Sequence, residues 1–435
     1  MKDRLKKLSQ VPLTILDGDR GTNYPNRSEF QEAGFCLFLN TSNVTKTGFD
    51  FSSTDFVSKE RDTLLRKGKL RRGDIVMTTR GTIGNVAYYG DHASYEHIRI
   101  NSGMVILRAD AKKLDPYFLY SFLRSDLFKK QTRSQGSGSA QPQLPIGSLR
   151  NIVIPQFDFA DQQDIGKVLA TLDDKIELNN RINEELEGLA KLLYDYWFVQ
   201  FDFPVTAAQA AAMGKPKLEG KPYRASGGKM TYNEALKREI PEEWDGRKLE
   251  EFEKNIITGK TPSTLVPEYH GGDIPFICIG DVRGNMHVVE TELTLSKLGA
   301  DSQRNKYIPK GAICVTCIAS PGLIAFASED SQTNQQLNSV ICEMEEHRYF
   351  LYFELKQHFR FSSGAKTGNT FSNMNKGDFS AIPVLVPPDD ILRKFHELVS
   401  PNISLALVNS LQNKELTELR DWLLPMLMNG QVTVS

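Results

Sequence analysis

The sequence lacks a long hydrophobic run. No stretch of about 18 consecutive apolar residues is present, and a membrane-spanning helix needs roughly that many. The N-terminal residues, MKDRLKKLSQVPL, include basic side chains but no apolar core of signal-peptide length. We therefore expect no membrane association and a cytoplasmic location. The 435 residues are 40% apolar and 25% charged, which is ordinary for globular proteins, and their number predicts two or three domains.

Cysteine is also scarce, with five residues in the chain. The odd number, in a chain that is neither small nor evidently secreted, argues against a disulfide framework. Cys314 and Cys317 form a CxxC, but no second pair or nearby histidines complete a set of zinc ligands. They lie in the apolar run AICVTCIAS, so we interpret them as buried strand cysteines and predict no metal site.

The most regular stretch is 162–199, which contains no proline and has apolar residues at alternating steps of three and four. Such spacing predicts a coiled-coil helix about 55 Å long rather than an ordinary surface helix. Lys175 and Asn179 are polar positions on the predicted seam, and such positions fix register at a cost in stability. The full seam is Ile165, Val168, Leu172, Lys175, Asn179, Ile182, Leu186, Leu189, Leu193 and Tyr196. A single long core helix is the alternative reading.

A second helix with the same pattern is predicted near the C-terminus. The segment 179–189 recurs at 409–419 with a constant offset of 230, so that Asn179 matches Asn409 and Leu186 matches Leu416. Pro401 interrupts the approach to this helix and restricts the residue before it. The two helices are expected to pair with each other, with Asn179 and Asn409 near the middle of an antiparallel pair.

The helix match belongs to a larger internal repeat. Residues 70–88 align with 308–326 at an offset of 238, and the run YFLY at 117–120 recurs at 349–352. Each copy is rich in short apolar runs separated by turn residues, which predicts strands. The fold class is therefore α+β, with two repeated strand-rich domains joined by two long antiparallel coiled-coil helices. The predicted boundaries are 1–155 for the first domain, 156–200 for the first helix, 201–240 for a linker, 241–387 for the second domain and 388–435 for the second helix.

Motifs for catalysis are missing. The run Thr258–Thr261 resembles the end of a phosphate loop, but Lys254 stands where that motif needs glycine, and Pro262 follows. The only Pro-Pro pair lies in 386–389 and lacks the flanking residues of an adenine methyltransferase motif. Glu354-Leu355-Lys356 is the best nuclease-like pair, yet the repeat does not share it. We predict a binding protein without cofactors rather than an enzyme.

Charge and loop chemistry point to DNA. Residues 1–155 contain 24 Lys/Arg and 15 Asp/Glu, a net of +9, whereas 241–387 contain 14 and 19, a net of −5. Basic side chains and hydroxyls suit phosphates, and Arg, Asn and Gln suit base edges. The candidates in the first domain are Arg20, Thr22, Asn23, Tyr24, Arg80, Thr82, Arg99, Asn101, Ser137, Ser139, Gln141 and Gln143. Those in the second are Lys260, Thr261, Ser263, Arg283, Asn338, Lys366, Thr370 and Asn373.

These features resemble a known family. The run DDKIELNNRINEELEGLAKLLYDYWFVQFDFP, the order of domain, helix, domain and helix, GKTPS at 259–263 and IPEEW at 240–244 are similar to type I restriction–modification specificity subunits. The resemblance implies two target recognition domains that read a bipartite double-stranded DNA target. It also implies two docked adenine methyltransferase (M) subunits, with restriction and translocation (R) subunits joining later, and no catalysis by this chain. A rod of about 55 Å corresponds to about 16 base pairs.

Apolar residues of the two helices are the predicted partner contacts, with the aromatic end around Trp197 expected to touch the methyltransferase. They are Ile182, Leu186, Leu189, Leu193, Tyr196, Trp197, Leu416, Leu419 and Leu423. Two other functions remain open. One is a fused restriction or methylation enzyme with unrecognised motifs, and the other is a coiled-coil scaffold that binds proteins. Activity of the purified chain would favour the first, and salt-dependent binding to duplex DNA would count against the second.

Overall fold

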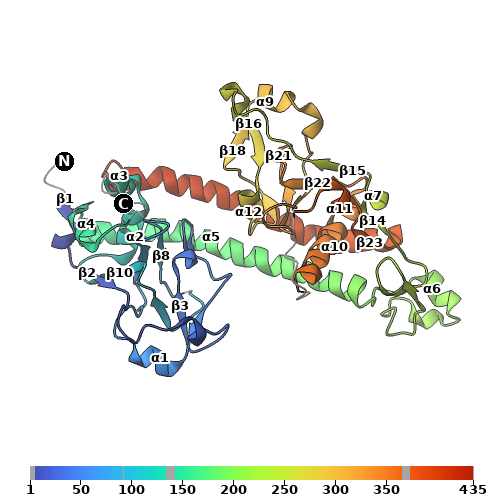
Figure 1. Ribbon diagram of the computed structural model, residues 1–435, viewed down its shortest axis with the longest axis horizontal. Coiled ribbons are helices and arrows are strands. Elements are labelled where there is room, and N and C mark those ends of the chain that lie inside the picture. The colour runs from blue at the N-terminus through green and yellow to red at the C-terminus, as the bar shows by residue number, and fades with distance from the viewer. Residues whose placement is uncertain (1–4, 92, 134–142, 365–372, 435) are drawn as a thin grey trace. The chain divides into compact units, whose positions relative to one another are not determined.

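The computed structural model describes residues 5–91, 93–133, 143–364 and 373–434. The chain divides into two compact units, one formed by Met1–Ile176 with Leu416–Ser435 and the other by Glu177–Glu415. Each unit combines a strand-rich domain with segments of two long helices (Figure 1). The predicted α+β class with a repeated domain is confirmed. Among the described residues, no helix has both the length and the apolar character needed to cross a membrane.

The two predicted rods are helices α5 (Phe159–Tyr194) and α12 (Asp389–Met428). Helix α12 runs through Pro401, where the sequence predicted an interruption. Pro401 is exposed, so the carbonyl that lacks its amide partner can bind water instead. The neighbouring Val399 and Ile403 are 1% exposed, and burial of such side chains stabilises the helix across the proline.

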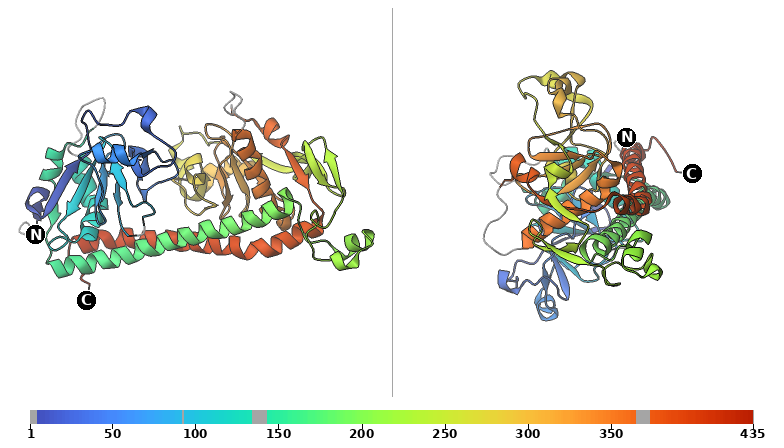
Figure 2. Two further views of the ribbon diagram at one scale, coloured as in Figure 1. Left: turned by 90° about the horizontal axis from the view of Figure 1, so that it is seen from below. Right: turned by 90° about the vertical axis from the view of Figure 1, so that its right-hand side faces the viewer.

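Asparagines join the two helices within the second unit. Asn179 Nδ2 donates to Asn413 Oδ1 at 2.8 Å, and Asn409 Nδ2 donates to Asn183 Oδ1 at 2.9 Å. Residue numbers rise along α5 as they fall along α12, so the helices are antiparallel there, as predicted (Figure 2). Because 179 and 183 recur as 409 and 413, the internal repeat also relates the two hydrogen bonds to each other. Asn179 is fully buried and Asn409 is 8% exposed.

Replacing Asn179 with Leu should raise thermal stability by about 1 kcal/mol and broaden the helix register. The substitution removes a buried amide whose Oδ1 has no partner among the described residues, while Gln412, one of its acceptors, is exposed and can turn to water. Thermal unfolding and the distance distribution between spin labels at Arg181 and Leu411 would measure both effects. Glu185→Leu, at an exposed position of the same helix, is the control. A less stable Asn179→Leu protein with a narrow distribution would contradict this prediction.

An ion cluster and an apolar contact join the helices within the first unit. Asp173 on α5 accepts from Arg420 Nη1 on α12 at 2.8 Å and from Arg124 Nη2 at 2.5 Å. Burial alone would raise the pKa of Asp173, but the adjacent Arg124 and Arg420 and the Tyr117 hydroxyl hold it below its usual value. Next to this cluster, residues of both helices share the first domain's core, including Ile165, Leu169, Leu424, Leu427 and Met428.

The first domain contains two main sheets. The larger is antiparallel with the order β2 (Leu13–Asp17), β10 (Met104–Ala109), β7 (Ile75–Thr78) and β8 (Val86–Tyr88). The smaller has the order β6 (Phe56–Val57), β3 (Cys36–Leu39) and β9 (Ile98–Ile100), and two short pairs are β1 (Leu5–Lys7) with β11 (Val153–Pro155) and β4 (Val44–Thr45) with β5 (Gly48–Phe49). The helices are η2 (Leu8–Gln10), η3 (Arg27–Glu29), η4 (Thr41–Asn43), α1 (Lys59–Leu64), α2 (Pro116–Arg124), α3 (Asp126–Arg133) and α4 (Ile146–Asn151). Asp115 caps α2 by accepting from Phe118 N, with Pro116 at the first helical position.

The second domain has a five-stranded sheet with the order β15 (Asn255–Thr258), β22 (Leu337–Ile341), β19 (Ile313–Thr316), β20 (Ile324–Ala327) and β17 (His287–Val288). A second sheet has the order β18 (Leu293–Leu295), β16 (His270–Ile277) and β21 (Gln332–Thr333), and β14 (Asp245–Lys248) pairs with β23 (Pro383–Val386). The helices are α7 (Leu249–Phe252), η7 (Pro267–Tyr269), α8 (Ile279–Val282), α9 (Lys297–Asp301), η8 (Arg304–Lys306), α10 (Glu345–Gly364) and α11 (Lys376–Ser380).

The repeat seen in the sequence is also a structural repeat. The β14–β23 pair corresponds to β1–β11, and the parallel pair β16–β21 corresponds to β3–β9. Thr78 Oγ1 donates to the Thr82 carbonyl, and at an offset of 238 Thr316 Oγ1 donates to the Ser320 carbonyl. Cys314 and Cys317 lie at 0% and 1% exposure in and just after β19, and burial raises the pKa of Cys314 to about 12. These cysteines are therefore buried, as predicted.

Residues 201–240, predicted as a linker, contain regular secondary structure. They form α6 (Ala207–Ala212), η6 (Pro216–Leu218) and the hairpin β12 (Met230–Asn233) and β13 (Arg238–Pro241). Phe203 stacks on Tyr223 at 4.7 Å and on Trp244 at 4.8 Å between ring centroids. A few aromatic side chains can order a segment that has no apolar periodicity, because each buries a large apolar area. Aromatic packing therefore orders the segment that joins the first helix to the second domain.

Candidate nucleic-acid interface

Predicted loops of the first domain meet at one end of its larger sheet. In the antiparallel register, Asp17 lies opposite Val105, Thr78 opposite Met104, and Met77 opposite Val86. The chain segments that follow β2 and β7 and precede β8 and β10 must therefore lie at the same end. They carry most of the predicted DNA contacts: Arg20, Thr22, Asn23, Tyr24, Arg80, Thr82 and Asn101. Gln143 joins them through a β-bridge with Arg80.

Charge and hydrogen bonding hold these loops in place. Arg20 Nη2 lies 3.1 Å from Asp17 Oδ2 and donates to the Ser102 carbonyl at 3.3 Å. Asp19 accepts from the amides of Gly21 at 2.9 Å and Arg66 at 2.7 Å. The Gly21 amide is the largest factor that lowers the pKa of Asp19 below its ordinary value. Asp19 therefore fixes the loop after β2 against the segment around residue 66.

Corresponding loops meet in the second domain. Thr258 lies opposite Asn338, Thr316 opposite Leu337, and Val315 opposite Ile324. The segments after β15 and β19 and before β20 and β22 thus share one end of the sheet. They carry the predicted residues Lys260, Thr261 and Ser263, and the predicted residues Arg283 and Asn373 contact them from other segments. Arg283 Nη2 donates to Ser320 Oγ at 3.2 Å, and Asn373 Oδ1 accepts from the Ala319 amide at 3.4 Å.

The buried seam of α5 differs from the predicted one at every second position. Ile165, Leu172, Asn179, Leu186 and Leu193 are buried or half-buried, as predicted. The alternate seam positions are one residue later than expected, at Leu169, Ile176, Asn183, Ala190 and Trp197. Lys175, Leu189 and Tyr196, which the sequence placed on the seam, are exposed instead, and Ile182 is half-buried.

The shifted seam leaves large apolar side chains on the helix surfaces. On α5, Leu178, Leu189 and Leu192 are 42–64% exposed. On α12, Val408, Leu419 and Trp422 are 43–59% exposed. The offset of 230 relates Leu178 to Val408, Leu189 to Leu419, and Leu192 to Trp422. We call Leu178, Leu189 and Leu192, which all lie in the second unit, the α5 stripe, and Leu419 and Trp422, which lie in the first unit, the α12 stripe. The exposed pair Leu189 and Leu192 therefore recurs as the exposed pair Leu419 and Trp422.

A family model for the type I restriction modification DNA specificity domain matches residues 14–188 and 241–413 of this chain. The chain belongs to the type I restriction–modification specificity family. It is 32% identical to the HindI specificity subunit of Haemophilus influenzae, over 95% of this chain and 98% of that protein. The MjaIX specificity subunit of Methanocaldococcus jannaschii is 25% identical over 83% of this chain and 78% of its own length.

The fold agrees with a solved structure. The crystal structure of the type I restriction–modification S subunit from M. genitalium covers 97% of this chain and 95% of its own chain, with 16% identity and a TM-score of 0.52. As a specificity subunit, the chain is non-catalytic and recognises DNA within a type I restriction–modification complex. Its two recognition domains serve a bipartite target, and it assembles with the other subunits of that complex.

Two residues predicted to contact DNA have structural roles instead. Arg99 of the specificity subunit is 5% exposed; its Nε donates to Asp62 Oδ1 at 2.6 Å and its Nη atoms to three backbone carbonyls. Asn338 is 2% exposed and bonds Thr258 Oγ1 at 2.6 Å and Cys317 Sγ at 3.1 Å. Both predictions were wrong, because these polar groups already have buried partners. Five others, Ser137, Ser139, Gln141, Lys366 and Thr370, lie outside the described residues.

The fold also places beside these loops several residues that were not predicted from the sequence. Arg66 and Lys67 are exposed, and their amides lie 2.7 Å and 3.4 Å from Asp19 Oδ2. The basic run RKGKLRR at 66–72 was a signal for them. Gln335 is exposed and accepts from Thr261 Oγ1 at 2.6 Å. The polar run NQQ at 334–336, just before β22, marked that turn.

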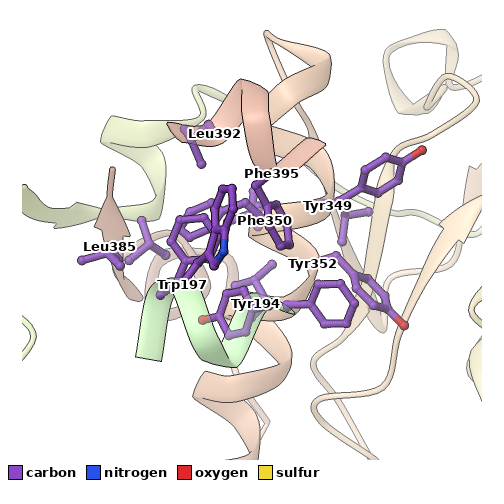
Figure 3. Packing of buried hydrophobic residues seen from close by; sticks show 14 of the residues in the cluster. Tyr194, Trp197, Tyr349, Phe350, Tyr352, Leu385, Leu392 and Phe395 are labelled. Carbon is purple, nitrogen blue, oxygen red and sulfur yellow. The ribbon is translucent and has the colours of Figure 1, made fainter. Parts of the chain in front are cut away.

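The predicted partner contacts divide by burial. Leu189, Tyr196 and Leu419 are exposed, whereas Ile182, Leu186, Leu193, Leu416 and Leu423 are half-buried. Trp197 is 3% exposed and belongs to the core of the second unit (Figure 3). A π-helical turn, Asp195–Val199, ends α5 and directs Trp197 and Phe198 into that core. The prediction that Trp197 touches the methyltransferase was therefore wrong, since its own domain covers it.

Replacing Trp197 with Ala should destabilise the second unit by about 3–5 kcal/mol, because it removes a buried indole. Its ring centroid lies 6.0 Å from that of Phe395 and 6.3 Å from that of Phe198. Thermal unfolding would measure the loss. The neighbouring Tyr196, which is 37% exposed, provides the control, and Tyr196→Ala should cost much less. Equal stability of the two variants would show that the indole is not part of the core.

Proposed function

We propose that each recognition domain reads one short base sequence, or word, of the bipartite DNA target. It does so through the loops that meet at one end of its main sheet. The duplication of these loops supports the proposal, because two copies of one scaffold bring exposed polar side chains to corresponding places. In the first domain these include Arg20 and Arg80, and in the second Lys260, Ser263 and Gln335. The two helices set the gap, which is the number of base pairs between the two words that the protein does not read. The chain acts in the cytoplasm, where DNA is accessible to it.

We further propose that two adenine methyltransferase subunits dock on the helices, one on the α5 stripe and one on the α12 stripe. Soluble proteins seldom leave large apolar side chains gathered on a surface unless a partner covers them. The internal repeat relates the two stripes, so a single partner surface fits both. This relation favours two identical partners over two different ones. Restriction and translocation subunits join the resulting complex.

Arg80→Ala should weaken DNA binding and, if Arg80 touches phosphate, lower the slope of log affinity against log salt by about 0.9. Arg80 is exposed directly after β7, at the loop end of the sheet. The measurement is a salt titration of the assembled complex on target duplex. Lys112→Ala is the matched control, because Lys112 is exposed beyond the opposite end of β10. If both variants change binding equally, general charge rather than this loop governs affinity.

The methylation pattern of cells tests the proposed function as a whole. Cells that contain the methyltransferase with this chain should methylate adenines within one split sequence. Cells with the methyltransferase alone should not methylate that sequence. Methylation of the same sequence in both would show that this chain does not select the target.

A further inference from the structure

The loop between β15 and β16 of the second domain carries a highly exposed apolar side chain. Leu265 lies between β15 and β16 and is 90% exposed, more than any other large hydrophobic side chain in the described part of the chain. A single exposed leucine is common on protein surfaces and needs no partner by itself. The loop that carries Leu265, however, is held firmly and belongs to the set of loops described above.

Both ends of this loop are fixed to the domain. The Lys260 amide donates to the Thr333 carbonyl at 2.9 Å, and the Lys260 carbonyl accepts from Gln303 Nε2 at 2.6 Å. A Cβ at Gly259 would lie 2.1 Å from the Asn334 carbonyl oxygen, so only glycine allows this close approach. At the far end, the Tyr269 carbonyl accepts from the Ser296 amide at 3.1 Å. The tip therefore projects from a rigid base.

The corresponding loop of the first domain, which follows β2, shows how the part of the loop that carries Leu265 differs. Both loops contain a buried proline, Pro25 or Pro262, and end in an acidic residue followed by an aromatic one. Three residues, 26–28, separate the proline from the acidic residue in the first domain, whereas five, 263–267, do so in the second. The extra length falls where Leu265 projects. The two domains therefore share the ends of this loop but differ in its length. Such a difference is expected if they recognise different DNA sequences.

We infer that Leu265 is a specificity-determining residue that contacts the 5-methyl group of a thymine in the major groove of the half-site read by the second domain. The inference rests on the proposed function. Thymine is the base that presents an apolar group in that groove, and apolar side chains recognise it there. Exposed Lys260, Ser263 and Thr264 flank the leucine, and an ammonium and hydroxyls suit the neighbouring phosphates. A protein-docking leucine would not need these neighbours.

Replacing single thymines of the second half-site with uracil, which lacks the methyl group, tests the contact. With the wild-type specificity subunit assembled with its methyltransferase, one such replacement should weaken binding about fourfold. This factor corresponds to the free energy gained by burying one methyl-sized group. Leu265→Ala should weaken binding to the thymine duplex by at least that factor. In the Leu265→Ala complex the thymine and uracil duplexes should bind equally. Thermal unfolding should not change, since Leu265 is exposed.

Leu298→Ala is the matched control, because Leu298 is 62% exposed on α9 of the same domain. It should keep the thymine preference. A Leu265→Ala complex that retains the full uracil penalty, or shows unchanged affinity and an unchanged methylated sequence, would overturn the inference. So would reduced recovery of the methyltransferase with Leu265→Ala, which would mark a protein contact. Failure of the proposed function would give a different result, because recognition of the half-site would then not depend on residues 241–387 at all.

Discussion

Exchanging residues 1–155 for the corresponding domain of another specificity subunit should change one word of the methylated target and leave the other word and the gap unchanged. The reason is the separation of tasks in the fold. The loops that meet beyond β2, β7, β8 and β10 belong to one domain, whereas in the proposed function the gap depends on α5 and α12. Sequencing methylated adenines in cells that carry the exchanged protein measures all three quantities at once.

The reciprocal exchange of residues 241–387 is the control for that experiment. It should change the second word and keep the first. A change of both words after one exchange would show that the domains do not read independently. A gap that follows the exchanged domain would show that the helices do not set the spacing. Either result would contradict the proposed division of labour.

Charged substitutions in one stripe should remove one of the two methyltransferase subunits. Leu189→Asp with Leu192→Asp affects the α5 stripe, and Leu419→Asp with Trp422→Asp affects the α12 stripe. An aspartate buried against an apolar partner surface loses its hydration without gaining a counter-charge, so docking should fail there. Native mass spectrometry of the co-expressed complex should show one methyltransferase per specificity subunit for each pair, and none when the pairs are combined.

Leu411→Asp is the control for these stripe variants. Leu411 is 42% exposed on α12, but its repeat counterpart is Arg181, so it is not part of the duplicated surface. This variant should keep two methyltransferase subunits. Thermal unfolding should stay within about 0.5 kcal/mol of wild type for every variant, because the altered side chains are exposed. Two subunits retained by both stripe pairs would place docking elsewhere.

The sequence by itself determined the features that depend on local pattern and on repetition. Residues 162–199 specify a long helix through their spacing, and the recurrence of 179–189 at 409–419 specifies its antiparallel partner. The repeat also predicted matching strands and turns in the two copies, as β7 with β8 and β19 with β20 have. The buried cysteines followed from an apolar run that both copies share.

Tertiary structure decided which side of each pattern faces inward. Along α5, apolar residues occupy two adjacent faces, so the sequence could not tell whether Leu189 or Ala190 lies on the seam. Packing against α12 selected the small Ala190 and the polar Asn183, and it left the larger Leu189 exposed. Close helix packing favours side chains that fit the facing holes over those that are most hydrophobic.

Tertiary structure also decided which polar residues remain free for DNA. Arg99 and Arg80 look alike in the sequence, yet Asp62 and three backbone carbonyls surround Arg99, while Arg80 stays exposed. Partners of this kind come from segments tens of residues away, so no local pattern reveals them. The same holds for Trp197, whose partner Phe395 lies almost two hundred positions further along the chain. Long-range burial, rather than residue type, separates the structural side chains of this specificity subunit from those available to bind.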